Sequence, residues 1–105
     1  MIPLLEAKRD ELDRLCAQYH VRRLELFGSA ARGDFDPGRS GLDFVVEFHA
    51  LALDEYADHY FGLLFALEDL FELPVDLLMR STVTNPYLLR EIETARILIE
   101  REQAG

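Results

Sequence analysis

The strongest constraint on the fold is a strand-like apolar segment that ends at a Gly-Ser pair and is soon followed by a second apolar segment. Residues 21–27 lead directly into Gly28-Ser29, and Gly33 follows after one short helical turn. The second segment, residues 42–48, carries an aspartate at position 43. Glycine permits a ligand to approach the backbone closely, and amides at the start of a helix attract anions. The pattern therefore predicts a strand, a phosphate-binding turn, a loop and a second strand with a carboxylate nearby.

Hydrophobic periodicity predicts one helix before these strands and one after them. Apolar residues recur at three- and four-residue spacing from about residue 4 to 19 and again from about residue 54 to 72. This spacing is typical of amphipathic helices, and Asp54 is the expected N-cap of the second one. Several apolar residues of the second helix are consecutive, so they cover more than one face. We therefore expect this helix to pack against another chain in a homo- or hetero-oligomer.

The last third of the chain predicts one more strand and one more helix. Residues 75–79 form a short apolar run, and Asn85-Pro86 is a favoured start for a helix that takes in the apolar residues up to Ile99. Ser29 is the expected cap of the short helix that Gly33 ends. The order α-β-α-β-α-β-α indicates an α/β (α+β) fold, with a small mixed sheet of about three or four strands packed with helices. Residues 1–105 are expected to form a single domain.

Composition limits the classes of partner. Twenty Asp and Glu against eleven Lys and Arg give a net charge of −9. This charge argues against binding to a nucleic-acid backbone, which depends on Lys and Arg, and it suits a basic protein partner. The apolar runs are much shorter than the roughly 20 residues that cross a bilayer, and the N-terminus lacks a signal-peptide core. We therefore expect a cytoplasmic protein that does not bind a membrane.

Two aspartates interrupt otherwise apolar strands. Asp43 lies within Leu-Asp-Phe-Val-Val, and Asp76 lies within Pro-Val-Asp-Leu-Leu. A carboxylate buried without a partner costs several kcal/mol, so each must point out of the core, pair with a cation or hold a metal. Because each acid lies near the start of its strand, the two could converge on one site.

The motif Gly28-Ser29-x-Ala31-Arg32-Gly33, followed by Ser40-x-x-Asp43 and then by Asp76 on a later strand, resembles the nucleotidyltransferase superfamily that includes DNA polymerase beta. The chain is more closely similar to the bacterial and archaeal minimal nucleotidyltransferases, which consist of little beyond the catalytic domain. The similarity covers nearly the whole chain, including Asn85-Pro86-Tyr87 at the start of the last helix. It implies the nucleotidyltransferase fold.

The resemblance also implies a role for each matched residue. Gly28 and Ser29 would bind the phosphates of the nucleotide. Asp43 would bind a metal, and Asp76 would bind a metal and deprotonate the attacking hydroxyl, in a two-metal Mg²⁺ site that stabilises the entering and leaving oxygens. Arg32 would either contact phosphate or anchor the short helix through a salt bridge, and the salt bridge is the preferred interpretation.

The chain departs from the family pattern at Gly41. The family usually has Ser-Asp-x-Asp, whereas this chain has Ser40-Gly41-Leu42-Asp43. The acid expected to contact both metals is therefore absent. Asp34 or Asp36 in the preceding loop could substitute, although loop acids are more often solvated turn residues. Because a missing metal ligand is rarely replaced without cost, we expect catalysis to be impaired.

Two function hypotheses follow from this resemblance. In the first, the chain transfers AMP from ATP to an acceptor and acts as an antitoxin that adenylylates a HEPN-type toxin. In the alternative, it is a catalytically impaired or inactive relative that neutralises its partner by direct contact and keeps affinity for the nucleotide. An antibiotic-modifying nucleotidyltransferase is disfavoured, because 105 residues leave no second domain to form a substrate pocket.

Overall fold

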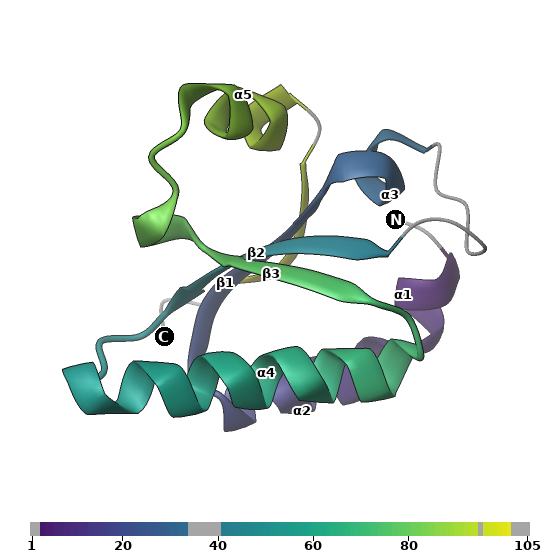
Figure 1. The fold of residues 1–105 in the computed structure, drawn as a ribbon. Helices are drawn as coiled ribbons and strands as arrows, with labels where there is room; N and C mark the ends of the chain where they lie inside the picture. Colours follow the sequence, from purple (N-terminus) through teal and green to yellow (C-terminus); the bar gives the residue numbers. More distant parts are fainter. Residues whose placement is uncertain (1–2, 34–40, 95, 102–105) are drawn as a thin grey trace.

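The computed structural model describes residues 3–33, 41–94 and 96–101. Figure 1 shows the elements in chain order. They are α1 (Pro3–Ala7), α2 (Arg9–Gln18), β1 (Val21–Phe27), α3 (Gly28–Arg32), β2 (Leu42–Phe48), the 3-10 helix η1 (Leu53–Glu55), α4 (Tyr56–Phe71), β3 (Val75–Met79), the 3-10 helix η2 (Arg80–Thr82), α5 (Pro86–Thr94) and β4 (Ile97–Arg101). The first three strands have the bounds expected from the sequence.

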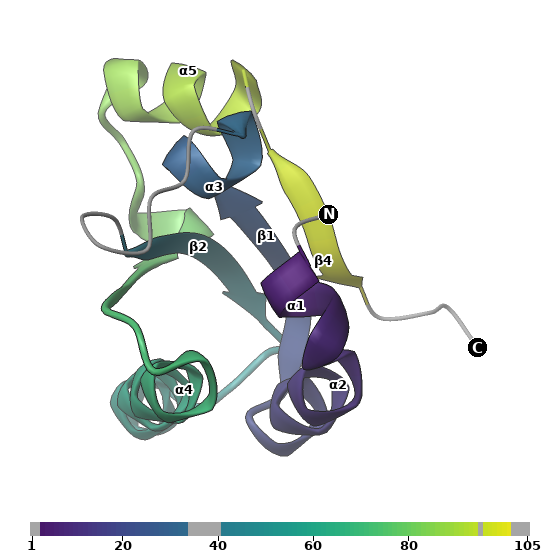
Figure 2. The same ribbon diagram turned by 90° about the vertical axis from the view of Figure 1, so that its right-hand side faces the viewer.

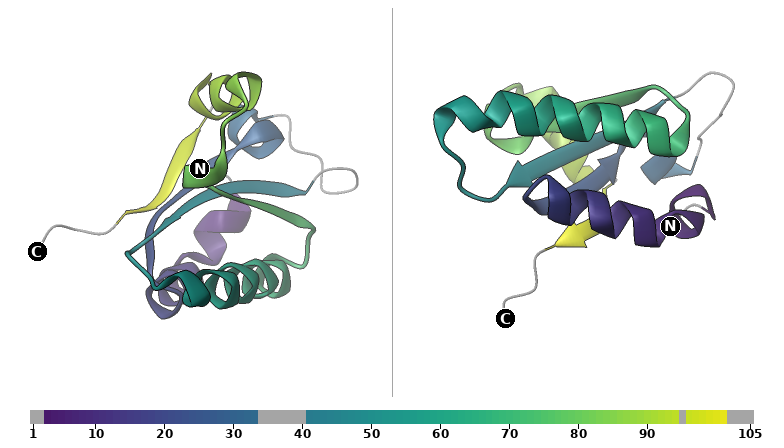
Figure 3. Two further views of the ribbon diagram at one scale, coloured as in Figure 1. Left: turned by 60° about the vertical axis from the view of Figure 1, so that its left-hand side comes forward. Right: turned by 90° about the horizontal axis from the view of Figure 1, so that it is seen from below.

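The strands form one mixed sheet in the order β3-β2-β1-β4. β1 is antiparallel to β2 and to β4, whereas β2 and β3 are parallel. Helices cover both faces of the sheet: α2 and α4 lie on one face, and α3 and α5 lie on the other (Figures 1 and 2). Seen from below in Figure 3, α2 and α4 run side by side across their face. The predicted α/β class with a small mixed sheet is confirmed.

The main core lies between the sheet and the layer of α2 and α4. Leu24 and Leu26 of β1, Phe44 of β2, and Leu63 and Leu67 of α4 are fully buried there. Alternate residues of each strand point to opposite faces of a sheet. The intervening residues therefore face α5, where a smaller apolar cluster forms around Phe27, Val45 and Ile92.

One element differs from the sequence prediction. The last helix ends at Thr94 instead of continuing to residue 99, and Ile97–Arg101 forms β4 beside β1. The run Ile97-Leu98-Ile99 is short and rich in β-branched residues, which favour strands. Pairing this run with β1 also satisfies the backbone N–H and C=O groups along the free side of β1. A helix in the same place would leave those groups to find other partners. The element order therefore gains a fourth strand at its end.

The predicted helix boundaries are correct at some positions and wrong at others. Asn85 accepts a hydrogen bond from the backbone N–H of Tyr87 at 2.9 Å, and Gly33 ends α3 in the left-handed conformation at φ 90°, both as expected. Ser29 does not cap α3, because the cap residue is Phe27 and no side chain bonds there. Asp54 lies within η1 and does not cap α4, whose N-cap residue is Glu55. The predicted first helix is divided at Lys8 into α1 and α2.

An ion-pair cluster around the buried Glu25 ties β1 to η2 and to the residue before β4. Glu25 of β1 is only 4% exposed. Its Oε1 lies 3.2 Å from Nε of Arg23 and 3.9 Å from Nη1 of Arg80, and its Oε2 lies 3.5 Å from Nε of Arg96. Arg80 also lies 3.7 Å from Glu93 of α5. Because a buried carboxylate is costly without cations around it, this cluster fixes the segments that surround it.

Side chains cover part of the outer edge of β3. The hydroxyl of Tyr60 on α4 donates to the carbonyl oxygen of Leu77, and the backbone N–H of Val75 donates to Oε2 of Glu68 at 3.4 Å. An edge strand whose backbone groups are engaged in this way is a poor template for pairing with another strand. Within the described residues, no helix is long and apolar enough to span a membrane.

Candidate functional site

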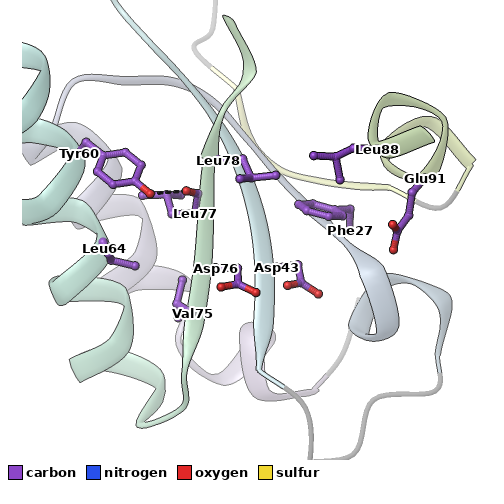
Figure 4. A pocket seen from close by; sticks show the side chains of 10 residues that line it. All are labelled: Phe27, Asp43, Tyr60, Leu64, Val75, Asp76, Leu77, Leu78, Leu88 and Glu91. Atoms are coloured by element: carbon purple, nitrogen blue, oxygen red, sulfur yellow. Dashed lines mark hydrogen bonds between the residues drawn. The ribbon is translucent and has the colours of Figure 1, made fainter. Parts of the chain in front are cut away.

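A cavity of about 460 Å³ lies along β3, between α4 on one side and α5 on the other, and it reaches the start of β2 and the end of β1. Figure 4 shows its two sides, with Tyr60 and Leu64 projecting from α4 and with Leu88 and Glu91 coming from α5. The remaining lining residues are Phe27, Asp43, Val75, Asp76, Leu77 and Leu78. The cavity therefore combines apolar walls with three carboxylates.

Asp43 and Asp76 lie side by side among the residues that line this cavity. They are register partners on the parallel strands β2 and β3, so their side chains project from the same face (Figure 4). The pKa of Asp43 is raised to about 6, first by burial, then by the hydrogen bond and the charge of Asp76, and last by the charge of Glu91. Arg32 opposes this increase. The sequence expectation that the two acids converge on one site agrees with this geometry.

Gly28 lies directly against Asp43. Its φ is 71°, a left-handed conformation that side chains disfavour, and a Cβ built on it would collide with Oδ2 of Asp43. Ser29 follows in the first turn of α3 and is partly buried. The turn at the end of β1 and the two carboxylates therefore belong to one site, and glycine is required at residue 28 for that contact.

Arg32 forms the salt bridge that the preferred interpretation expected. Its Nη1 lies 3.3 Å from Oε1 of Glu91 on α5. A contact between Arg32 and phosphate stays a prediction. Sequence reasoning missed Glu91 as a site residue, because its position on the chain carries no motif. The one sequence feature that could have pointed to Glu91 is its position on α5 next to Ile92, which is buried against the sheet.

Gly41 contributes no carboxylate to the site, and it lies against the backbone of Pro74. The N–H of Leu42 donates to the carbonyl oxygen of Pro74 at 2.9 Å, and a Cβ at Gly41 would lie 2.5 Å from that oxygen. An aspartate here would require the Pro74 segment to shift. Asp34 and Asp36, the predicted substitutes, lie outside the described residues, as does Ser40.

The donor set fits one hard cation better than two. Within the described ranges, no group of three or more His, Cys, Asp or Glu residues is arranged to hold a metal ion. Asp43 and Asp76 do form an adjacent pair of oxygen ligands. Mg²⁺ is commonly held by one or two carboxylates together with substrate phosphates and water. The pair therefore fits a single Mg²⁺-like ion that arrives with a phosphorylated ligand.

The chain is similar in sequence and in fold to known nucleotidyltransferases. A model of the nucleotidyltransferase domain family matches residues 9–99. "Putative protein adenylyltransferase MJ1379" of Methanocaldococcus jannaschii is 34% identical over 82 residues, which are 78% of this chain and 80% of that protein. A solved structure described as "Structure of putative minimal nucleotidyltransferase" is 29% identical with a TM-score of 0.64, over 91% of this chain and 95% of its own.

A further solved structure shares the fold at low identity. It is described as "tri-AMPylated Shewanella oneidensis HEPN toxin in complex with MNT antitoxin". The matching chain is 16% identical with a TM-score of 0.58, over 92% of this chain and 72% of its own length. At this identity the likeness shows the fold alone.

Proposed function

This chain belongs to the nucleotidyltransferase family, and we propose that it transfers AMP from ATP to a hydroxyl group of a protein partner. One observation carries the proposal. Asp43 and Asp76 lie side by side in a cavity of about 460 Å³, and Gly28 lies directly against Asp43. That volume is within the range of small-molecule and cofactor sites. The relative named as a protein adenylyltransferase supports a protein as the acceptor.

The chain's own residues would divide the work of the transfer. The turn at Gly28 and Ser29 would bind the phosphates, because it brings the backbone next to the carboxylates without an intervening side chain. The acceptor oxygen forms a bond to the α-phosphorus of ATP, the bond from that phosphorus to the bridging oxygen breaks, and pyrophosphate leaves. Asp76 is the more exposed of the two carboxylates and would accept the proton of the hydroxyl.

Asp43 and Asp76 would also hold a divalent cation such as Mg²⁺. When bound, the cation would offset the negative charge that the carboxylates and the phosphates bring together. Gly41 supplies no further ligand, so we expect slower transfer than in a family member with an acid at that position. The same observation favours the second candidate function, in which the chain binds its partner and the nucleotide but does not turn over.

A HEPN-type protein is the proposed partner. The support comes from the complex of an AMPylated HEPN toxin with an antitoxin, in which a chain of the same fold occurs. We propose that this chain is the antitoxin of such a pair and acts in the cytoplasm. The absence of a HEPN-family gene beside the gene for this chain would contradict the proposal.

Intact mass spectrometry tests the transfer. The HEPN-family protein encoded beside this chain is incubated with ATP, Mg²⁺ and either the native chain, Gly41→Asp or Gly41→Ala. We expect a slow gain of AMP with the native chain and a faster gain with Gly41→Asp. Gly41→Ala is the matched control, because it adds the Cβ that meets Pro74 without adding a carboxylate. No gain with either the native chain or Gly41→Asp, although a complex forms, would support the binding function instead.

A further inference from the structure

The outer surface of α4 carries two large apolar side chains that are more than half exposed. Phe61 is 51% exposed and Phe65 is 58% exposed. They lie one helical turn apart, and their rings stack with centroids 6.2 Å apart. Exposed aromatic side chains that lie next to each other are typical of protein–protein contact sites.

This aromatic pair is continuous with the candidate active site. The ring of Phe61 packs edge-on against Tyr60, with centroids 5.1 Å apart. Tyr60 and the neighbouring Leu64 line the cavity that contains Asp43 and Asp76 (Figure 4). A protein seated on Phe61 and Phe65 would therefore lie beside the mouth of that cavity.

The segment that carries the aromatic pair is acidic. Residues 40–79 contain nine Asp and Glu and no Lys or Arg, while the rest of the chain has eleven residues of each sign and is neutral overall. The net charge of −9 therefore arises from this one segment. On α4 itself, Asp58 lies before the two phenylalanines and Asp69 lies after them, and both are exposed. A second copy of this chain would bring like charges together, whereas a basic surface would be attracted.

We propose that Phe61 and Phe65 form the docking surface for the acceptor protein, and that this protein presents an apolar groove rimmed by Lys and Arg. This inference rests on the proposed function, because it identifies the surface through which the partner of that reaction is recognised. Docking beside the cavity mouth would hold a hydroxyl-bearing segment of the partner near Asp76. The two aromatic rings supply the buried contact. Asp58 and Asp69, the acidic rim of this surface, supply selectivity and fast association.

Calorimetric titration of the native chain with the HEPN-family protein encoded beside it tests this surface. The double variant Phe61→Ser/Phe65→Ser should bind at least about 30-fold more weakly, as expected for two aromatic hot-spot residues. Leu98→Ser is the matched control, because Leu98 is an exposed apolar residue on β4, at the opposite edge of the sheet. It should bind as the native chain does. Circular dichroism and ATP binding should be unchanged in the double variant, which shows that its fold and site are intact.

A second variant tests the acidic rim. Asp58→Lys/Asp69→Lys should slow association with the same partner and reduce its dependence on salt concentration. Native-like binding by both double variants would overturn the inference but leave the proposed transfer standing. Failure of the native chain to bind would contradict both. Sedimentation of the chain alone should show a monomer, and a dimer that Phe61→Ser/Phe65→Ser dissociates would assign the surface to a second copy instead.

Discussion

Replacing Asp43 by asparagine should stabilise the metal-free protein at neutral pH. The folded protein raises the pKa of Asp43 to about 6, chiefly through burial and then through Asp76. The ordinary value of an aspartate is about 3.9. Between these two values the folded state keeps a proton that the unfolded state releases, so stability falls as the pH rises from about 4 through 6. Asparagine is neutral at every pH and retains a hydrogen-bonding side chain next to Asp76.

The expected size of this effect follows from the difference in pKa. A shift of about two units corresponds to roughly 3 kcal/mol at full effect. Because Asp43 is only partly buried, solvent screening reduces this to about 1–2 kcal/mol at pH 7.5. At pH 4, where Asp43 is protonated in the folded protein, the native chain and the variant should differ little.

Urea denaturation followed by circular dichroism at pH 4, 5, 6 and 7.5, in the presence of a chelator, measures this difference. Asp69→Asn removes an exposed carboxylate outside the cavity and controls for the change in net charge. If Asp43→Asn is stabilised equally at pH 4 and 7.5, or not at all, the folded protein does not raise the pKa of Asp43 and the reasoning is refuted. Adding Mg²⁺ should stabilise the native chain more than the variant, because the variant has lost one of the two carboxylates.

Three further substitutions test contacts within the site and elsewhere in the fold. Gly28→Ala should lower the free energy of unfolding by about 1–3 kcal/mol and by more than Gly33→Ala does. Both glycines have positive φ, but among the described residues only the Cβ at residue 28 meets another side chain. Equal losses in chemical denaturation would contradict this. Glu25→Gln should cost about 2–3 kcal/mol, because three arginines lose their shared charge partner; a neutral effect on the melting curve would refute that role. Tyr60→Phe should cost about 1 kcal/mol in the same assay, through loss of the hydrogen bond to Leu77; an unchanged denaturation midpoint would show that the bond contributes nothing.

The sequence identified the first three strands, because these depend on local patterns, and it also indicated that Asp43 and Asp76 could converge. Alternation of apolar residues and the turn chemistry at Gly28 and Gly33 are visible within a few positions of the chain. The position of Asp43 beside Asp76 required only that the two strands be neighbours in one sheet. Parallel neighbours bring equivalent ends of their strands to the same edge, so acids near both starts meet.

Features that depend on tertiary pairing were not predictable in the same way. The apolar residues of Ile97–Arg101 suit a helix or a strand. The segment forms a strand because one side of β1 is open for pairing with it. Glu91 reaches the cavity because α5 packs over β1 and β2, which no local pattern specifies. The contact between Gly41 and Pro74 is likewise set by strand pairing. The sequence showed only that an acid is absent there.

Calorimetric titration of the chain with ATP, with and without Mg²⁺, tests most directly whether the turn at Gly28 and the carboxylate pair form one nucleotide site. We expect saturable binding in Mg²⁺ that weakens when the cation is removed and weakens again in Asp76→Asn. Asp69→Asn should bind as the native chain does. Equal binding by the native chain and Asp76→Asn, or no binding in Mg²⁺ at all, would contradict the account.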